Sequence, residues 1–95
     1  MPAYAVFIRE KTVNQKELEI YWSKVEETFA GLPIKILAAY GTQQTLEGPP
    51  SEGTVIAQFP TVADARKWYD SAAYQSILHH RQKGAVYRAL IVEGV

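Results

Sequence analysis

The chain has 95 residues, no cysteine and a formal net charge of zero, with ten Lys and Arg against ten Asp and Glu. This length fits a single domain over residues 1–95, and the lack of cysteine excludes disulfides, thiolate metal sites and cysteine nucleophiles. The balanced charge argues against binding to nucleic acid or to an anionic membrane. No apolar run reaches the roughly 20 residues of a membrane helix and residues 1–10 lack signal-peptide features, so we expect a cytoplasmic protein.

The first third of the chain predicts a strand followed by a helix. Residues 3–10 are rich in branched and aromatic side chains, as strands are. Asn14, followed three residues later by Glu17, forms a capping-box pattern that starts a helix. Apolar residues then recur at helical spacing over residues 18–29, and Gly31 predicts the end of this helix.

The middle of the chain predicts a hairpin with a long arm. Residues 34–40 and 54–59 are strand-like, and a cluster of turn-forming residues at 48–53 separates them. Gly41 predicts a bulge where the first of these strands ends.

The last third predicts a second helix and a closing strand. Thr61 and Asp64 repeat the capping pattern, and Ser71 recaps the chain for a further helical segment. Gly84 predicts the end of that segment, and residues 86–93 supply the last strand.

The resulting β-α-β-β-α-β order predicts an α+β fold of the ferredoxin-like kind, with a four-stranded antiparallel sheet and two helices on one face. A sheet with one bare face should alternate apolar and polar residues, yet several strands are apolar on both faces. Since no residues of the chain remain to cover the bare face, a second copy of the chain is the simplest way to bury it. The sequence therefore predicts a homodimer formed through the open sheet face.

Four short sequence segments, together with this order of elements, point to a known family. They are Ala3-Tyr4-Ala5-Val6-Phe7, Leu46-Glu47-Gly48-Pro49-Pro50, Trp68-Tyr69-Asp70-Ser71-Ala72-Ala73-Tyr74-Gln75 and Ile91-Val92-Glu93-Gly94. With Arg81 following the third string, the chain resembles domain-of-unknown-function family 1330 over nearly its whole length. The resemblance implies a dimeric α/β barrel, a group that includes cofactor-free monooxygenases, muconolactone-type isomerases and small ligand-binding modules.

A set of aromatic residues is the first candidate for a binding site. These side chains would line a cleft between the helices and the sheet, where their rings and hydroxyl tips orient a small planar ligand. The alternative is that aromatic residues at helical spacing simply pack in the core. The set comprises Trp22, Tyr40, Trp68, Tyr69 and Tyr74.

His79, His80 and Arg81 form the candidate catalytic group near the end of a helix. A neutral imidazole can act as a base, and the guanidinium of Arg81 can hold a carboxylate or an enolate. The alternative is structural, because cations at a helix C-terminus are favoured by the helix dipole. Neighbouring histidines point about 100° apart on a helix and cannot share one metal ion, so we expect no metal site.

Other polar residues leave two possibilities open. Arg9, Gln58 and Arg88 interrupt apolar strands, where they either face a ligand cavity or emerge at strand edges. No glycine-rich loop joins a strand to a helix, so no nucleotide cofactor is expected.

Three functions fit these patterns. The first is a dimer that binds a small organic molecule, either aromatic or acidic, between the helices and the sheet. The second is a cofactor-independent isomerase or monooxygenase that uses a histidine base and Arg81 as an anion clamp. The third is an interaction module that uses the polar arm at residues 42–53.

Overall fold

The computed structural model describes residues 1–95 and confirms the predicted order of elements, with the second helix divided in two. The strands are β1 (Ala3–Thr12), β2 (Lys35–Ala39), β3 (Gly53–Phe59) and β4 (Ala85–Glu93). The helices are α1 (Gln15–Val25), α2 (Val62–Tyr69) and α3 (Ala72–Gly84), with a 3₁₀ turn η1 (Glu26–Phe29) after α1.

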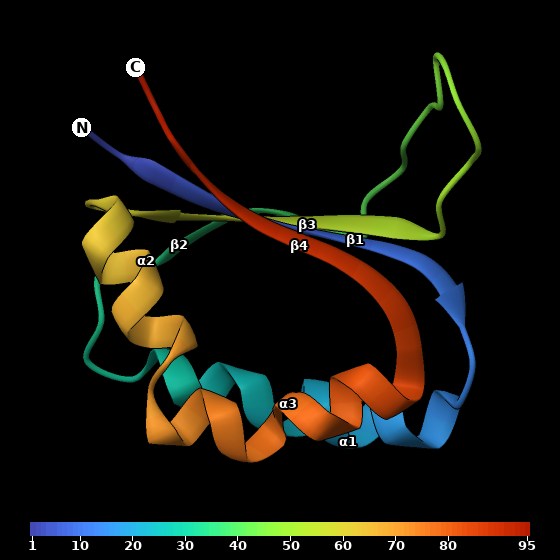
Figure 1. Cartoon of the computed structure of the whole chain (residues 1–95), viewed down its shortest axis with the longest axis horizontal. Coiled ribbons are helices and arrows are strands. Elements are labelled where there is room, and N and C mark those ends of the chain that lie inside the picture. The colour runs from blue at the N-terminus through green and yellow to red at the C-terminus, as the bar shows by residue number, and fades with distance from the viewer.

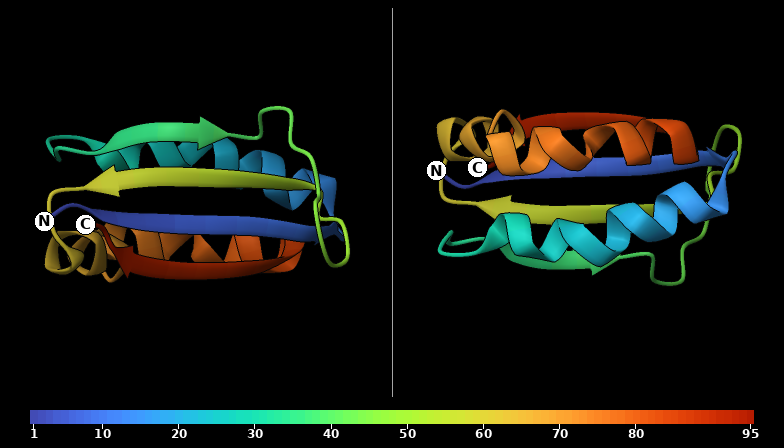
Figure 2. Two further views of the ribbon diagram at one scale, coloured as in Figure 1. Left: turned by 90° about the horizontal axis from the view of Figure 1, so that it is seen from above. Right: turned by 90° about the horizontal axis from the view of Figure 1, so that it is seen from below.

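All four strands belong to one antiparallel sheet in the order β2-β3-β1-β4. The helices lie on one side of this sheet, and the long connection between β2 and β3 rises on the other side (Figure 1). Figure 2 shows α1 and α3 side by side, with α3 across β4 and β1 and α1 across β3 and β2. This arrangement confirms the predicted ferredoxin-like α+β fold.

Three polar side chains start the helices, as the sequence predicts. The Asn14 side chain accepts a hydrogen bond from the backbone N–H of Glu17 at 3.4 Å. Thr61 Oγ1 accepts one from the Asp64 N–H at 3.1 Å, and Ser71 Oγ accepts one from the Tyr74 N–H at 3.2 Å. Each cap satisfies a backbone donor that the first helical turn leaves free, and the Ser71 cap lets α3 begin in a new direction.

Two predicted details are wrong. The first helix does not run unbroken to residue 29, because it narrows to a 3₁₀ turn after Val25. The predicted bulge at Gly41 is also misplaced, since β2 already ends at Ala39 and its register with β3 shifts between Ile36 and Ala38. Pairing with β3 decides where β2 bends, and glycine spacing alone carries no information about that pairing.

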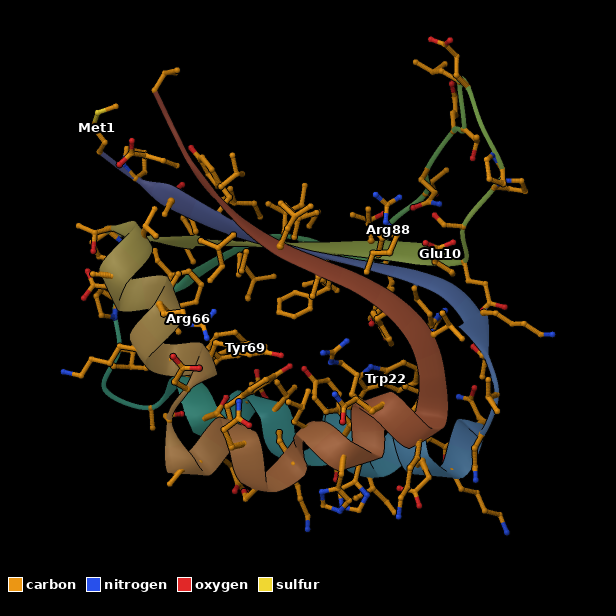
Figure 3. The ribbon with its side chains drawn as sticks, in the orientation of Figure 1. Met1, Glu10, Trp22, Arg66, Tyr69 and Arg88 are labelled. Atoms are coloured by element: carbon orange, nitrogen blue, oxygen red, sulfur yellow. The ribbon has the colours of Figure 1, made fainter.

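Strand β1 alternates between the two faces of the sheet. Ala3, Ala5 and Phe7 are buried toward the helices, whereas the residues between them are half-buried on the opposite face. Figure 3 shows Arg88 on the face away from the helices, and Trp22 on the helix side. The sheet therefore presents one face to its own helices and a second face that the chain leaves uncovered.

The core between sheet and helices is rich in aromatic rings, and Trp68 lies at its centre. Its ring centroid is 4.3 Å from that of Tyr74 and 5.5 Å from that of Phe59. The indole N–H of Trp68 donates a hydrogen bond to Thr28 Oγ1 at 2.9 Å, which ties α2 to η1. Gly84 brings α3 close to α1, because a Cβ atom there would lie 2.7 Å from Leu18 Cγ.

None of the helices combines the length and the apolar character that a membrane span requires.

Candidate functional site

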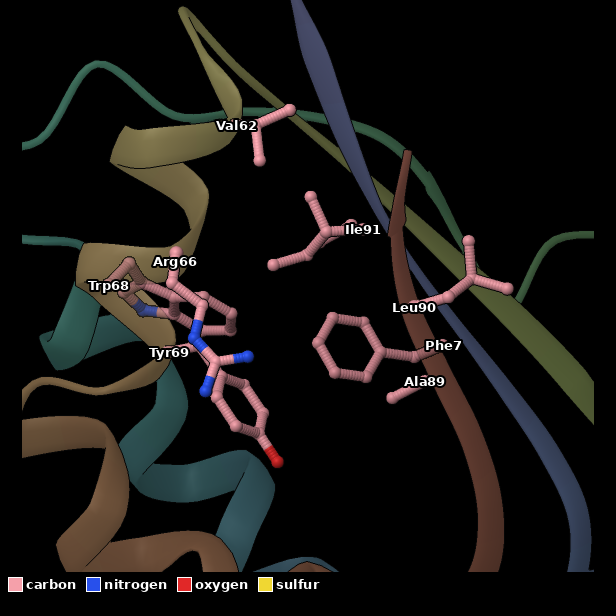
Figure 4. A pocket seen from close by; sticks show the side chains of 9 residues that line it. Phe7, Val62, Arg66, Trp68, Tyr69, Ala89, Leu90 and Ile91 are labelled. Atoms are coloured by element: carbon pink, nitrogen blue, oxygen red, sulfur yellow. The ribbon is translucent and has the colours of Figure 1, made fainter. Parts of the chain in front are cut away.

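Two cavities lie on the helix side of the sheet. The inner cavity, of about 170 Å³, is bounded by the sheet, α1 and the residues that follow it, and twelve of its thirteen lining residues are hydrophobic. The α2–β4 cavity, of about 370 Å³, lies between α2 and the strands β1 and β4 (Figure 4). Phe7 and Trp68 line both cavities, so the two spaces adjoin.

Small side chains in the strands leave room for these cavities. Ala57 and Ala39 line the inner cavity, and Ala5 and Ala89 line the α2–β4 cavity. Ala5 is paired in register with Ala57, so two neighbouring strands both carry only a methyl group at this level. The surrounding aromatic rings cannot collapse fully onto the sheet where alanine stands.

Arg81 is the only charged residue that lines the inner cavity. It is 5% exposed, and its guanidinium carbon lies 4.9 Å from the ring centroid of Tyr87 and 5.5 Å from that of Phe7. Arg81 forms no ion pair, and its Nε atom is buried without a hydrogen-bond partner. The cation–π contacts offset part of the cost of burial, but no anion of the chain neutralises the charge.

Arg9 lies beside the same cavity and has a partner. Its guanidinium carbon is 4.8 Å from the ring centroid of Tyr40 and 5.5 Å from that of Trp22. Arg9 Nε is 3.3 Å from Glu52 Oε1, and the Thr12 hydroxyl donates a 2.5 Å hydrogen bond to that oxygen. This hydrogen bond, with the charge of Arg9, lowers the pKa of the Glu52 carboxyl group. The charge of Arg9 therefore has a carboxylate partner, in contrast to that of Arg81, although Arg9 Nε also lacks a hydrogen bond.

Tyr21, Tyr40 and Tyr87 line the inner cavity, and their hydroxyls form two tyrosine pairs. Tyr40 and Tyr87 share a hydrogen bond of 2.5 Å, and Tyr21 and Tyr74 share one of 2.8 Å. Burial raises the pKa of Tyr21, Tyr74 and Tyr87 above the ordinary tyrosine value. These hydroxyls stay protonated at neutral pH and cannot serve as bases, and those of Tyr21 and Tyr87, which line the cavity, can donate hydrogen bonds to a ligand.

Tyr40 reaches the cavity through an unusual backbone conformation. Its φ of 59° is positive, which costs energy for a residue other than glycine. Its ring lies over Gly53, where a Cβ atom would be 2.5 Å from Tyr40 Cδ1, and its centroid is 5.7 Å from that of Trp22. The absence of a side chain at Gly53 thus lets the Tyr40 ring form a wall of the cavity.

The structure brings together four of the eight predicted site residues, and a fifth, Tyr69, lines only the α2–β4 cavity. Trp22, Tyr40, Trp68 and Arg81 all line the inner cavity. Tyr74, in contrast, is fully buried and lines neither cavity, as the core-packing alternative expects. It supports the lining from behind, through its hydroxyl contact with Tyr21 and its ring contact with Trp68.

His79 and His80 line neither cavity. His80 Nδ1 lies 2.5 Å from Glu17 Oε2 on α1, and the imidazole rings of the two histidines are 4.0 Å apart. The hydrogen bond from His80 lowers the pKa of the Glu17 carboxyl group. Arg81 turns toward the sheet while His80 joins two helices, so the predicted group of three does not share one space.

The sequence prediction missed Phe7 and Tyr87 as lining residues. Strand alternation was the available signal, because Phe7 follows Ala3 and Ala5 on the buried face of β1. Tyr87 pairs in register with Arg9, which places both on that face, whereas Gln58 and Arg88 pair with Tyr4 and Ile8 on the other. Of the three polar strand residues left open, only Arg9 thus faces the helices.

His, Asp and Glu side chains form no cluster of three or more that could hold a metal ion. The charged groups near the inner cavity are arginines, which bind anions and do not ligate cations.

The family model described as Domain of unknown function (DUF1330) matches residues 2–95 of the chain. No curated protein is significantly similar to it in sequence.

Solved structures share the fold at low sequence identity. A protein of unknown function from Rhodopseudomonas palustris is 18% identical with a TM-score of 0.78, covering 99% of this chain and 82% of that one. A dimeric ferredoxin-like protein of unknown function from Thermobifida fusca is 15% identical with a TM-score of 0.66, covering 99% and 92%. SnoaB, a cofactor-independent oxygenase from Streptomyces nogalater, is 8% identical with a TM-score of 0.62, covering 99% and 93%. These likenesses establish the fold alone.

Proposed function

Because the chain belongs to the family described as Domain of unknown function (DUF1330), whose name assigns no activity, we propose a function from its own cavity. The protein binds a small organic acid with a flat apolar body, and the acid group meets Arg81 in the inner cavity. The observation that carries this proposal is a buried guanidinium that faces an aromatic cavity and has no anionic partner.

The physical chemistry of buried charge supports an anionic ligand. A buried ion without a partner is costly, and a carboxylate that forms charge-assisted hydrogen bonds with it removes much of that cost. Trp22 also lines the inner cavity, and its indole Nε1 is another buried donor without a hydrogen-bond partner in the chain. A ligand with acceptor oxygens would satisfy both donors.

The size of the inner cavity supports a ligand with one ring. An apolar protein cavity of about 150 Å³ holds benzene, and the inner cavity has about 170 Å³. The aromatic side chains around it favour stacked or edge-on contact with a flat ring.

We expect benzoate and phenylacetate to bind at least about tenfold more tightly than benzamide and phenylacetamide, because a hydrogen bond to a charged group contributes about 1.5–3 kcal/mol. Isothermal titration calorimetry at neutral pH compares each acid with its amide, which has nearly the same shape. Equal affinities within each pair, or no binding by either acid, would contradict the proposal.

A cofactor-independent isomerase or oxygenase acting on such an acid is the second candidate. The observation that favours it is the Tyr40–Tyr87 hydroxyl pair beside the Arg81 guanidinium, since these donors can stabilise an anion formed from a bound substrate. SnoaB, which has this fold, is a cofactor-independent oxygenase. A base role for His79 or His80 lacks geometric support, because neither lines a cavity.

We also propose that two copies pair through the uncovered sheet face. The support is twofold: relatives of this fold are described as dimeric ferredoxin-like proteins, and this face carries apolar side chains on neighbouring strands. In the middle of the sheet Val6 pairs in register with Ile56 on one side and with Leu90 on the other, and Leu90 is 45% exposed. A twofold axis would stack this row against its own copy.

Val6→Asp is expected to convert the dimer to monomers at micromolar concentration, because a carboxylate would be buried in an apolar interface. Sedimentation velocity measures the change, and circular dichroism checks that the variant stays folded. Val13→Asp is the matched control, since Val13 is 67% exposed and lies outside the sheet. A Val6→Asp protein that sediments like the wild type would place the interface elsewhere.

A further inference from the structure

The α2–β4 cavity is larger than the inner cavity and is lined mostly by hydrophobic residues. It has about 370 Å³, and eight of its nine lining residues are hydrophobic. Arg66 is the exception, and its Nε already pairs with Asp70 Oδ2 at 2.7 Å on the same helix. Figure 4 shows the Arg66 guanidinium beside the Tyr69 ring, with Ile91 and Phe7 across the space. The cavity therefore suits an apolar group and offers no uncompensated charge.

Phe7 and Trp68 form the boundary that this space shares with the inner cavity, where Arg81 lies. Their rings meet edge to face, with centroids 6.1 Å apart, and both rings line both cavities. The Phe7 ring also lies 5.5 Å from the Arg81 guanidinium carbon. Arg81, the Phe7 ring and the α2–β4 cavity thus follow one another on the helix side of the sheet. Of the two charged residues that line the cavities, Arg66 is paired and Arg81 is not.

The α2–β4 cavity opens to solvent beside an edge strand. β4 has a partner strand on one side only. Val62 on α2 lines the cavity and is nevertheless 39% exposed. A ligand can therefore enter between α2 and β4 with its polar end leading.

We infer that the two cavities act as one slot and that the natural ligand is an amphipathic carboxylic acid longer than a single ring. Its carboxylate meets Arg81, and its hydrocarbon tail passes the Phe7 ring and fills the α2–β4 cavity. This inference rests on the proposed function and adds the chemical class of the ligand. The carboxylate belongs at Arg81 because Arg66 is two-thirds exposed and already paired.

The test compares hexanoate with decanoate, and decanoate with 1-decanol, by calorimetry on the full chain below the concentrations at which the ligands aggregate. Each buried methylene adds to affinity, so decanoate should bind at least about tenfold more tightly than hexanoate. Decanoate should also bind at least about tenfold more tightly than 1-decanol, which lacks the charge that Arg81 would meet.

Ala89→Phe supplies the structural arm of the test. Ala89 lines only the α2–β4 cavity and pairs in register with Phe7, so a large ring there fills the tail space. Decanoate affinity should fall to that of hexanoate, and hexanoate affinity should stay unchanged. Ala63→Phe, at an exposed position of α2 outside the lining, is the matched control. Val62→Phe, at the opening, is the second variant if Ala89→Phe does not fold.

The outcomes separate the two levels of the proposal. Hexanoate and decanoate binding equally well would overturn the slot and leave the acid site at Arg81 intact. A decanoate advantage that both Ala89→Phe and Val62→Phe leave unchanged would also overturn it. Binding of neither hexanoate, decanoate nor benzoate would remove the proposed function itself.

Discussion

Arg81→Met is expected to weaken benzoate binding by about ten- to hundredfold, because it removes charge-assisted hydrogen bonds to the acid. The same change should leave the free energy of unfolding equal to that of the wild type or above it. Methionine keeps much of the side-chain length and apolar contact with Phe7 and Tyr87, and it removes a buried charge that has no partner. Calorimetry measures the first effect and urea denaturation the second.

Lys83→Met is the matched control for Arg81→Met. Lys83 lies on the same helix, is exposed and lines neither cavity, so its loss should change neither affinity nor stability appreciably. If Arg81→Met lowers stability and leaves benzoate affinity unchanged, the guanidinium serves the fold and the acid site lies elsewhere. That result would favour the helix-dipole explanation for a cation in the last turn of α3.

Trp68→Ala is expected to lower the free energy of unfolding by about 3–5 kcal/mol, the usual loss when a large aromatic side chain is removed from a core. Trp68 is 3% exposed, packs against Phe59 and Tyr74, and bonds through its indole N–H to Thr28. Removing it opens a void between α2 and the sheet and leaves the Thr28 hydroxyl without its donor. Urea unfolding followed by circular dichroism measures the loss.

The control for Trp68→Ala is Trp22→Ala, which removes the same ring from a half-buried position. Because Trp22 borders the inner cavity and its N–H has no partner, its removal should cost clearly less. Both variants are compared at one protein concentration, since dimerisation would add to the apparent stability. Equal losses for the two variants would show that Trp68 is not the centre of the core.

Local signals in the sequence predicted the fold well. Asn14, Thr61 and Ser71 each cap a helix as expected, because a cap depends only on residues within one turn. The four-stranded antiparallel sheet with its helices on one face followed from the sequence of elements and the few connections that such a chain allows. Neither inference required knowledge of the tertiary contacts between side chains.

The candidate site was only partly predictable, because it depends on long-range register. Arg81 and His80 are neighbours in the sequence, yet one points at the sheet and the other at Glu17 on α1. About 100° separates neighbouring residues on a helix, so which of them faces the cavity depends on how α3 sits on the sheet. Tyr87 joins the site only because β4 pairs with β1 at Arg9.

The alternation of β1 divides two roles between successive residues. Ala5 and Phe7 border the cavities, whereas Val6, between them, belongs to the face proposed to meet a second copy. Ligand preference and self-association can therefore change independently during evolution, by point substitutions at odd or at even positions of one strand. A one-residue deletion within β1 would exchange the two sets, turning Val6 inward and Phe7 outward, and would damage both properties at once.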